Sequence, residues 1–233
     1  MSATPAAPTD STRGRRPDVV AFDVNETIVS LEPVRERLVA AGEPPGALEL
    51  FFARTLQHCF ALATLDEWWP FRDVARASLQ QTTGLSEDQI GAVLAAFGEL
   101  PAQPDVEPAF ERLATAGVRI AVLTHGPAST ATRMLERTGL SRYVEQVITG
   151  ETVRSFKPAR APYLYACAMC GVQPDRMALV AAHAWDCHGA RKAGLSTGWV
   201  SRARAATPDI YLRADSVGAT LVDVVDGLLA LPV

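Results

Sequence analysis

The sequence has little of what a disulfide scaffold, a membrane span or a nucleic-acid surface needs. Its 233 residues hold four cysteines, too few and too irregularly spaced for a disulfide framework. No apolar run approaches the roughly 20 residues of a transmembrane helix. The net charge of −4 argues against holding nucleic acid by its phosphates. We therefore expect a cytoplasmic protein that binds a small-molecule substrate and neither nucleic acid nor membrane, while a homodimer stays open.

Two local patterns do not indicate a functional site. Cys167 and Cys170 form a Cys-x-x-Cys pair, but neither a second pair nor clustered histidines follow at metal-ligand spacing, so packed thiols are predicted. Residues 1–16 are rich in Ser, Thr, Pro and Ala and end in several arginines. Because no long apolar segment follows these arginines, we expect a flexible N-terminal tail and not a signal peptide.

What is present is the composition of an ordinary globular chain, 48% hydrophobic and 21% charged. Between residues 31 and 100 only helical patterns occur, and Ser86 followed by Gln89 predicts a capping box at the start of one helix. Prolines from Pro101 to Pro108 mark the end of this block. The predicted helices lie at 33–41, 45–62, 69–82 and 86–97. An all-helical block inserted after a first strand is typical of a cap domain.

Beyond the prolines, strand and helix patterns alternate. The predicted strands are a first one within 19–28, then 119–123, 144–148, 177–181, 197–200 and a short one near Tyr211. The predicted helices are 106–116, 128–138, 162–170, one around Ala190, and 216–229. This alternation predicts parallel β-α-β units and hence an α/β fold with a doubly wound, Rossmann-like parallel sheet.

Residues with useful chemistry stand where the predicted strands end. Asp23 closes the first apolar run and is followed four residues later by Thr27. Along the chain come a strand-end Asp, a strand-end Thr, a loop Lys and a second Asp after a strand: Asp23, Thr124, Lys157 and Asp186. The carboxyl ends of parallel strands meet at one edge of a sheet, so these side chains are expected to lie together.

These four stretches, in this order, resemble the four motifs of the haloacid dehalogenase (HAD) superfamily. Three tracts further resemble the L-2-haloacid dehalogenases, also called type II: Lys157 to Tyr163, Ala184 to Arg191 and Gly198 to Arg202. The resemblance covers nearly the whole chain from about residue 17 and is weakest in the helical block. It implies a HAD core domain of residues 17–30 and 101–233 and a small helical cap domain of residues 31–100.

The resemblance also implies a reaction, the hydrolysis of a carbon–halogen bond in a small 2-haloalkanoic acid through a covalent aspartyl ester. Asp23 would be the nucleophile, and Lys157 would keep it ionised and oriented. Thr27 and Thr124 would donate hydrogen bonds to this carboxylate or to the substrate acid. Asp186 would polarise the hydrolytic water or hold Lys157.

Asn25 separates this expectation from the phosphatases of the superfamily, which generally carry there a second Asp that protonates the leaving alcohol. Asn25 cannot donate or take a proton at working pH, whereas a departing halide needs none. Those phosphatases also bind Mg²⁺ with several acidic residues, and few acids accompany Asp23 and Asp186. We therefore expect no metal or other cofactor. A Mg²⁺-dependent phosphatase, a hydrolase of another carbon–heteroatom bond and a binding protein without turnover remain alternatives.

The substrate-binding positions depart from the family pattern. His125 and His183 stand where the dehalogenases commonly have asparagine, and two imidazoles near one carboxylate would change its proton chemistry. Phe52 stands where they have a carboxylate-binding arginine. Either Arg54, after a small rotation of its helix, or backbone N–H groups near Asn25 and His125 are expected to hold the substrate acid, and Arg54 is the choice here unless it faces solvent. The aromatic cluster at 68–71 either lines a leaving-group pocket or forms cap core. The residues expected to bind substrate are Asn25, Arg54, His125, Tyr163, His183 and Trp185.

Overall fold

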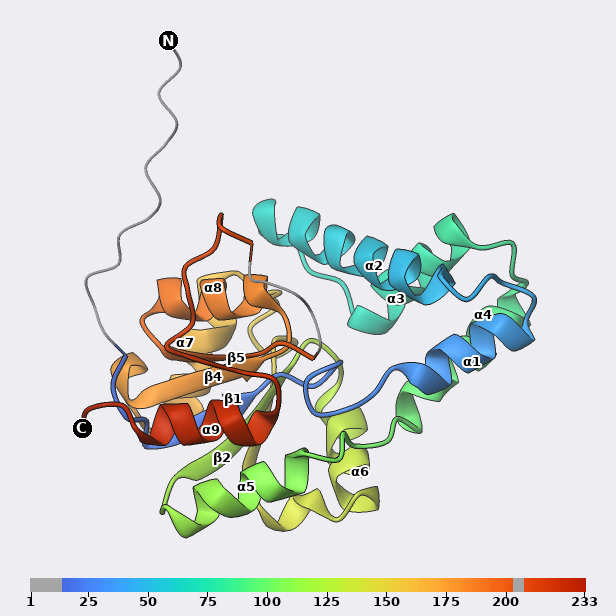
Figure 1. The fold of residues 1–233 in the computed structure, drawn as a ribbon. Coiled ribbons are helices and arrows are strands. Elements are labelled where there is room, and N and C mark those ends of the chain that lie inside the picture. Colours follow the sequence, from blue (N-terminus) through green and yellow to red (C-terminus); the bar gives the residue numbers. More distant parts are fainter. Residues whose placement is uncertain (1–13, 203–207) are drawn as a thin grey trace.

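The computed structural model describes residues 14–202 and 208–233, and a six-stranded parallel sheet forms the centre of this part (Figure 1). The strand order is β3-β2-β1-β4-β5-β6, so the chain reverses its progression across the sheet beside β1. Ligands of such sheets bind at this reversal, outside the carboxyl ends of the strands. The strands are β1 (Val19–Phe22), β2 (Arg119–Thr124), β3 (Val144–Thr149), β4 (Met177–Ala181), β5 (Ser196–Val200) and β6 (Ser216–Gly218).

Helices cover both faces of the sheet. Side chains alternate along a strand, so Val20 and Phe22 enter one hydrophobic cluster while Val19 and Ala21 enter another. The first face carries α5 (Val106–Thr115), α6 (Ala128–Arg137) and α9 (Leu221–Leu229), and the second carries α7 (Arg160–Met169) and α8 (Ala184–Ala193). Burial on both faces explains why the strands are continuous apolar runs. The structure confirms the predicted α/β fold.

A helical insertion follows β1 and stands to one side of the sheet (Figure 1). Its helices are α1 (Glu32–Ala40), α2 (Ala47–Thr64), α3 (Phe71–Thr82) and α4 (Glu87–Ala95). The predicted capping box is present, because Ser86 N–H donates to Gln89 Oε1 at 2.9 Å and Gln89 N–H donates to Ser86 Oγ at 3.4 Å. Short 3₁₀ turns occur at Ala96–Gly98, Leu140–Arg142 and Pro174–Arg176.

The C-terminal elements differ from the prediction. Tyr211 lies in a turn closed by its N–H on the Pro208 carbonyl, and the sixth strand is Ser216–Gly218. The last helix therefore begins at Leu221 and not at residue 216. Thr220 and Asp223 form a capping box there, and this Thr-x-x-Asp signal marks the start of the helix better than the apolar pattern does. The first strand likewise ends at Phe22, before the loop that carries Thr27.

The predicted N-terminal tail falls mostly on residues 1–13, outside the described part. Residues 14 and 15 contact the core. Arg15 exchanges two hydrogen bonds of 3.0 Å with Ser196 Oγ, and Gly14 N–H donates to Asp215 Oδ1 at 3.0 Å. The four cysteines are buried free thiols, as the packed-thiol prediction requires. Of the helices in the described part, none combines the length and apolar character that crossing a bilayer demands.

Candidate active site

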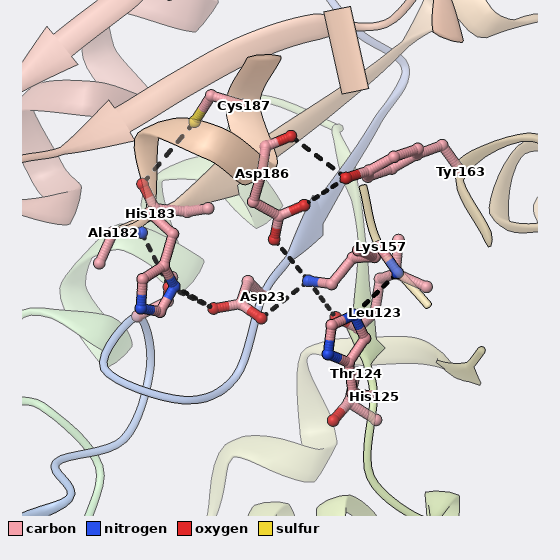
Figure 2. A network of polar contacts seen from close by, with 12 residues as sticks. Asp23, Leu123, Thr124, His125, Lys157, Tyr163, Ala182, His183, Asp186 and Cys187 are labelled. Atoms are coloured by element: carbon pink, nitrogen blue, oxygen red, sulfur yellow. Dashed lines mark hydrogen bonds and ion pairs between the residues drawn. The ribbon is translucent and has the colours of Figure 1, made fainter. Parts of the chain in front are cut away.

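The predicted reactive side chains meet at the carboxyl edge of the three central strands (Figure 2). Asp23 follows β1 directly and is fixed by its own N–H, which donates to the Val180 carbonyl of β4 at 3.0 Å. Thr124 ends β2, Lys157 comes from the loop before α7, and Asp186 lies in the first turn of α8. The strand order places β1 between β2 and β4, which is why residues over 160 positions apart in sequence share one site.

Lys157 joins the two carboxylates. Its Nζ lies 2.8 Å from Asp23 Oδ1 and 2.5 Å from Asp186 Oδ2, and it also donates to the Leu123 carbonyl at 3.3 Å. The side chains of Lys157 and Asp186 are 1% and 0% exposed, whereas that of Asp23 is 10% exposed. Asp23 is therefore the carboxylate of the pair that a ligand can reach.

Burial and charge act against each other in this cluster. Burial disfavours the ammonium, but Asp186 and Asp23 outweigh it and raise the pKa of Lys157. Burial likewise opposes ionisation of Asp23, yet Lys157 and His183 hold the pKa of that carboxyl far below its usual range. For Asp186 burial dominates and, with the nearby charge of Asp23, raises its pKa. Asp23 is therefore ionised at working pH.

Thr27 fixes the second oxygen of Asp23. Its hydroxyl donates to Asp23 Oδ2 at 2.8 Å and accepts the Ala182 N–H at 2.9 Å, so it links the β1 loop to the end of β4. Arg202 holds the same loop by donating to the Thr27 carbonyl at 2.5 Å. Thr124 instead accepts the Gly126 N–H at 3.0 Å, and the residue lines the cavity next to Asp23.

Tyr163 lies behind the site and not in it. Its hydroxyl donates to Asp186 Oδ1 at 2.6 Å, and the side chain is fully buried, so it positions Asp186 and does not reach a substrate. Gly189 permits this packing, because a Cβ there would stand 2.7 Å from the Tyr163 hydroxyl. The predicted substrate contact of Tyr163 is thereby replaced by a contact with Asp186. Of the two roles foreseen for Asp186, its position favours holding Lys157.

The two unexpected histidines both lie at the site, with opposite charge preferences. His183 Nε2 lies 2.9 Å from Glu26 Oε2, and its Nδ1 lies 3.5 Å from Asp23 Oδ2. Although burial opposes the charge, the two carboxylates raise the pKa of His183 to about 9. His125 Nε2 accepts the backbone N–H of Lys157 at 2.9 Å. Burial, with the charges of Lys157 and His183, lowers the pKa of His125 to about 3.

A narrow cavity opens above Asp23. Its walls are Asp23, Asn25, Phe52, Leu56, Phe71, Thr124, His125, His183 and Trp185. The cavity has a volume of about 10 Å³, about enough for one water molecule. Asn25, His125, His183 and Trp185 therefore stand where a substrate was expected to be bound. Phe71, from the aromatic cluster whose role the sequence left open, is also part of this wall.

Arg54 does not join these residues, which corrects the expected substrate clamp. Its guanidinium donates to Gln57 Oε1 at 2.6 Å, one turn along the exposed side of α2. Phe52 and Leu56 occupy the face of α2 that reaches the cavity, because residues four apart share one face of a helix. Sequence reasoning missed Glu26, and the available signal was its place as the only acid between Asp23 and Thr27.

The site does not suit the Mg²⁺ that phosphatases of this fold use. A hard cation needs several oxygen ligands, but the Lys157 ammonium already stands between Asp23 and Asp186 and takes one oxygen of each. The position that would offer a further acid is Asn25. In the described ranges, no cluster of three or more His, Cys, Asp or Glu side chains is arranged to hold a metal ion.

Two features define the class of this α/β protein. One is a parallel sheet with a helical insertion after its first strand. The other is a buried carboxylate, paired with a lysine, at the point where the strand order reverses. The chain belongs to the haloacid dehalogenase-like hydrolases, because the model of that family matches residues 17–194. (S)-2-haloacid dehalogenase 4A of Burkholderia cepacia is 31% identical over 158 residues. That match spans 66% of this chain and 66% of the enzyme.

Solved structures agree on the fold. The L-2-haloacid dehalogenase from Xanthobacter autotrophicus superposes with a TM-score of 0.83 at 20% identity, covering 90% of this chain and 97% of that one. The same enzyme with chloropropionic acid covalently bound superposes with a TM-score of 0.80. Phosphatases are also related, since phosphoglycolate phosphatase 1 of Pseudomonas aeruginosa is 27% identical over 199 residues, which are 78% of this chain and 68% of that enzyme. Membership of the family therefore leaves the reaction open.

Proposed function

We propose that this protein is a metal-independent hydrolase that cleaves the carbon–halogen bond of a small 2-haloalkanoic acid through a covalent ester on Asp23. The observation that carries the proposal is the state of Asp23, an ionised and partly exposed carboxylate at the end of a cavity. It is held by Lys157 and Thr27, with Asn25 in place of a general acid. The related dehalogenases support the choice of substrate class.

In the first step an oxygen of Asp23 attacks the carbon that bears the halogen. A carbon–oxygen bond forms, the carbon–halogen bond breaks with inversion, and the electron pair leaves with the halide. Lys157 keeps the nucleophile ionised, and its hydrogen bond together with that of Thr27 restricts the carboxylate to one orientation. The departing halide needs no proton, so the reaction does not require an acid at the position of Asn25.

In the second step water attacks the ester carbonyl and releases the 2-hydroxy acid. The water oxygen ends on Asp23, one of its protons goes to the departing alkoxide, and the regenerated acid loses its proton to solvent. Lys157 favours this last loss because it stabilises the carboxylate. The sum is substrate plus water giving hydroxy acid, halide and one proton.

Halide release from 2-chloropropionate tests the proposal. The purified protein should release halide at the same rate in EDTA and in added Mg²⁺, because a departing halide needs no Lewis acid. The Asp23→Asn variant is the control and should release none.

Phosphate release from phosphoglycolate that requires Mg²⁺ would instead assign the protein to the phosphatase branch. Turnover of neither substrate, with binding of the haloacid retained, would indicate a binding protein.

A further inference from the structure

The second step needs a base, and the geometry leaves few groups for this role. Asp186 is fully buried, and its two carboxylate oxygens already accept from Lys157 and Tyr163. His125 has its Nε2 occupied by the Lys157 N–H. By contrast, His183 lines the cavity, and its Nδ1 is buried without a hydrogen-bond partner among the described residues, 3.5 Å from Asp23 Oδ2.

We propose that His183 is the general base of ester hydrolysis, that Glu26 positions it, and that formation of the ester on Asp23 switches it from a cation to a base. This inference rests on the proposed covalent reaction and adds a catalytic residue to it. A water molecule that attacks the Asp23 carbonyl carbon from this side lies within one hydrogen bond of Nδ1, the reach that a general base requires.

Glu26 is built to hold the imidazole. Its oxygen lies 2.9 Å from His183 Nε2, so the proton of a neutral ring is kept on Nε2 and the lone pair of Nδ1 faces Asp23. Glu26 adopts a φ of 59°, in the left-handed region that non-glycine residues seldom occupy. Backbone strain of this kind concentrates at functional positions. Trp185 and Phe52 flank the ring, with centroids 5.4 and 5.9 Å away.

The charges around His183 explain the switch. Asp23 and Glu26 face the ring and favour its protonated form, whereas burial disfavours it. Lys157, from the loop before α7, lies beyond Asp23, and His125 at the end of β2 is neutral. When Asp23 becomes an ester, the oxygen 3.5 Å from Nδ1 loses its charge while the Lys157 charge remains. The substrate's own carboxylate is carried on the esterified carbon and not on this oxygen. The pKa of His183 therefore falls, and its Nδ1 proton leaves to solvent.

The proton then follows a balanced path. Nδ1 takes one proton from the attacking water as the water oxygen bonds to the ester carbon. The tetrahedral intermediate expels the alkoxide, which receives that proton from Nδ1. Asp23 is left protonated, loses its proton beside Lys157, and as a carboxylate again raises the pKa of His183.

Histidine NMR tests the switch without a substrate. In protein labelled with ¹³C-histidine, the His183 signal is identified by its loss in His183→Asn. Asp23→Asn imitates the uncharged ester and should lower the pKa of His183 by about one unit or more. Asp175→Asn, a surface change at the opposite end of β4 from the site, is the matched control and should leave it unchanged. An unaltered pKa in Asp23→Asn would overturn the switch and leave the proposed function standing.

Single-turnover kinetics with 2-chloropropionate test the base. His183→Asn should release about one equivalent of halide rapidly and then slow about 100-fold, with the ester adduct visible in the intact mass. His188→Asn, in α8 just after His183 but in contact with Tyr211, should turn over as wild type does. Glu26→Gln should move the acidic limb of the pH–rate profile to lower pH, because it removes a charge that favours the imidazolium.

Each kinetic outcome is decisive. If His183→Asn slows the halide burst and steady turnover equally, or slows neither, the base role is overturned. Halide release by wild type would still uphold the proposed reaction. No halide release by wild type would overturn the reaction, and the base role with it.

A different observation, a second cavity, carries an inference about the substrate. It has a volume of about 330 Å³, lies between the insertion and α6, and shares Asn25, Phe71 and Thr124 with the narrow cavity. Its walls are mostly apolar, with Leu94, Phe97 and Met134 among them. Arg72 and Arg133, both exposed, also line it.

We infer that the hydrocarbon chain of the substrate extends into this second cavity and that the two arginines attract its anion. The inference rests on the proposed function and specifies its substrate as a 2-haloalkanoic acid longer than three carbons. The narrow cavity is too small for such a chain, whereas the second cavity offers apolar walls next to the same Phe71 and Thr124. Burying each further CH₂ group is worth about 0.8 kcal/mol in such a site, a factor of about four.

Chain-length preference tests this inference. Wild type should have a kcat/KM for 2-chlorohexanoate about tenfold or more above that for 2-chloropropionate. Ala95→Phe fills the second cavity and should lower only the value for the longer acid, while Ala92→Phe, exposed on the same helix outside the cavity, should change neither. A kcat/KM that stays level or falls with chain length would overturn the inference alone, whereas no release from either acid would overturn the proposed function too.

Discussion

The floor and the roof of the cavity are built from different chemistry. The floor comes from the strand ends and holds Asp23, Lys157, Asp186 and His183, each with a charged partner. The insertion contributes apolar side chains from α2 and α3 to the roof, and Arg54 on α2 turns to the surface. Charge next to the reacting carboxylate is therefore supplied by the sheet and not by the insertion.

The sharpest test of the floor is Asp23→Asn. The amide keeps the volume but is a far poorer nucleophile, so halide release should fall by at least about 10⁴-fold. Circular dichroism should show an intact fold. Activity above a few per cent of wild type would exclude covalent catalysis through this residue.

Lys157→Met should be the most destabilising single change in the floor. It leaves two buried carboxylates without their counter-ion, which costs on the order of 3–5 kcal/mol of unfolding free energy. Urea unfolding at neutral pH measures this cost. The only other lysine, Lys192, is exposed on α8, so Lys192→Met is the matched control and should stay within about 0.5 kcal/mol of wild type.

The pH dependence of stability should report the charge on His183. Its pKa in the folded protein is about 9, above the value of about 6.5 for a free histidine. The stabilisation is therefore complete below pH 6.5 and is lost as pH rises through 9. Wild type should lose on the order of 2 kcal/mol between pH 6.5 and 9.5, and His183→Asn should not show this loss. Parallel curves for the two proteins in urea unfolding would contradict the assigned charge.

The roof should give the smallest effect. Arg54→Ala removes a surface contact with Gln57, so KM for 2-chloropropionate should change by less than about twofold. Steady-state kinetics on a neutral chloroalkyl amide provide the comparison, because an arginine that binds the acid would affect only the charged substrate. A several-fold rise in KM confined to the acid would return Arg54 to the site and abolish the contrast between roof and floor.

Sequence patterns predicted the fold well because each pattern is local. Apolar runs, glycine stops and the Ser86 capping box placed the helices and strands within a few residues. The prediction failed at the sixth strand, because Tyr211 lies in a turn and the strand Ser216–Gly218 carries too short a pattern to be recognised. Its error then displaced the start of the last helix, although Thr220 and Asp223 carried the correct signal.

The prediction of the site likewise succeeded where the pattern is local and failed where packing decides. Asp23, Thr27, Lys157 and Asp186 come together as expected, since strand ends and their loops share one edge of the sheet. Tyr163 was expected to touch substrate, but only the packing of α7 against α8 shows that its hydroxyl faces Asp186. The direction of Arg54 depended on the rotation of α2 against the sheet, which no pattern within the helix specifies.

The sequence by itself determined the alternation of strands and helices and the ordered set of reactive residues. It also determined that position 25 holds Asn25 and not an acid. These properties follow from residue type and spacing along the chain. Only the tertiary structure decided the charges of the histidines. His125 and His183 are chemically identical, but one accepts the Lys157 N–H in a buried, positively charged setting and the other lies between two carboxylates. Proton affinity depends on neighbours in space, and the fold supplies those neighbours.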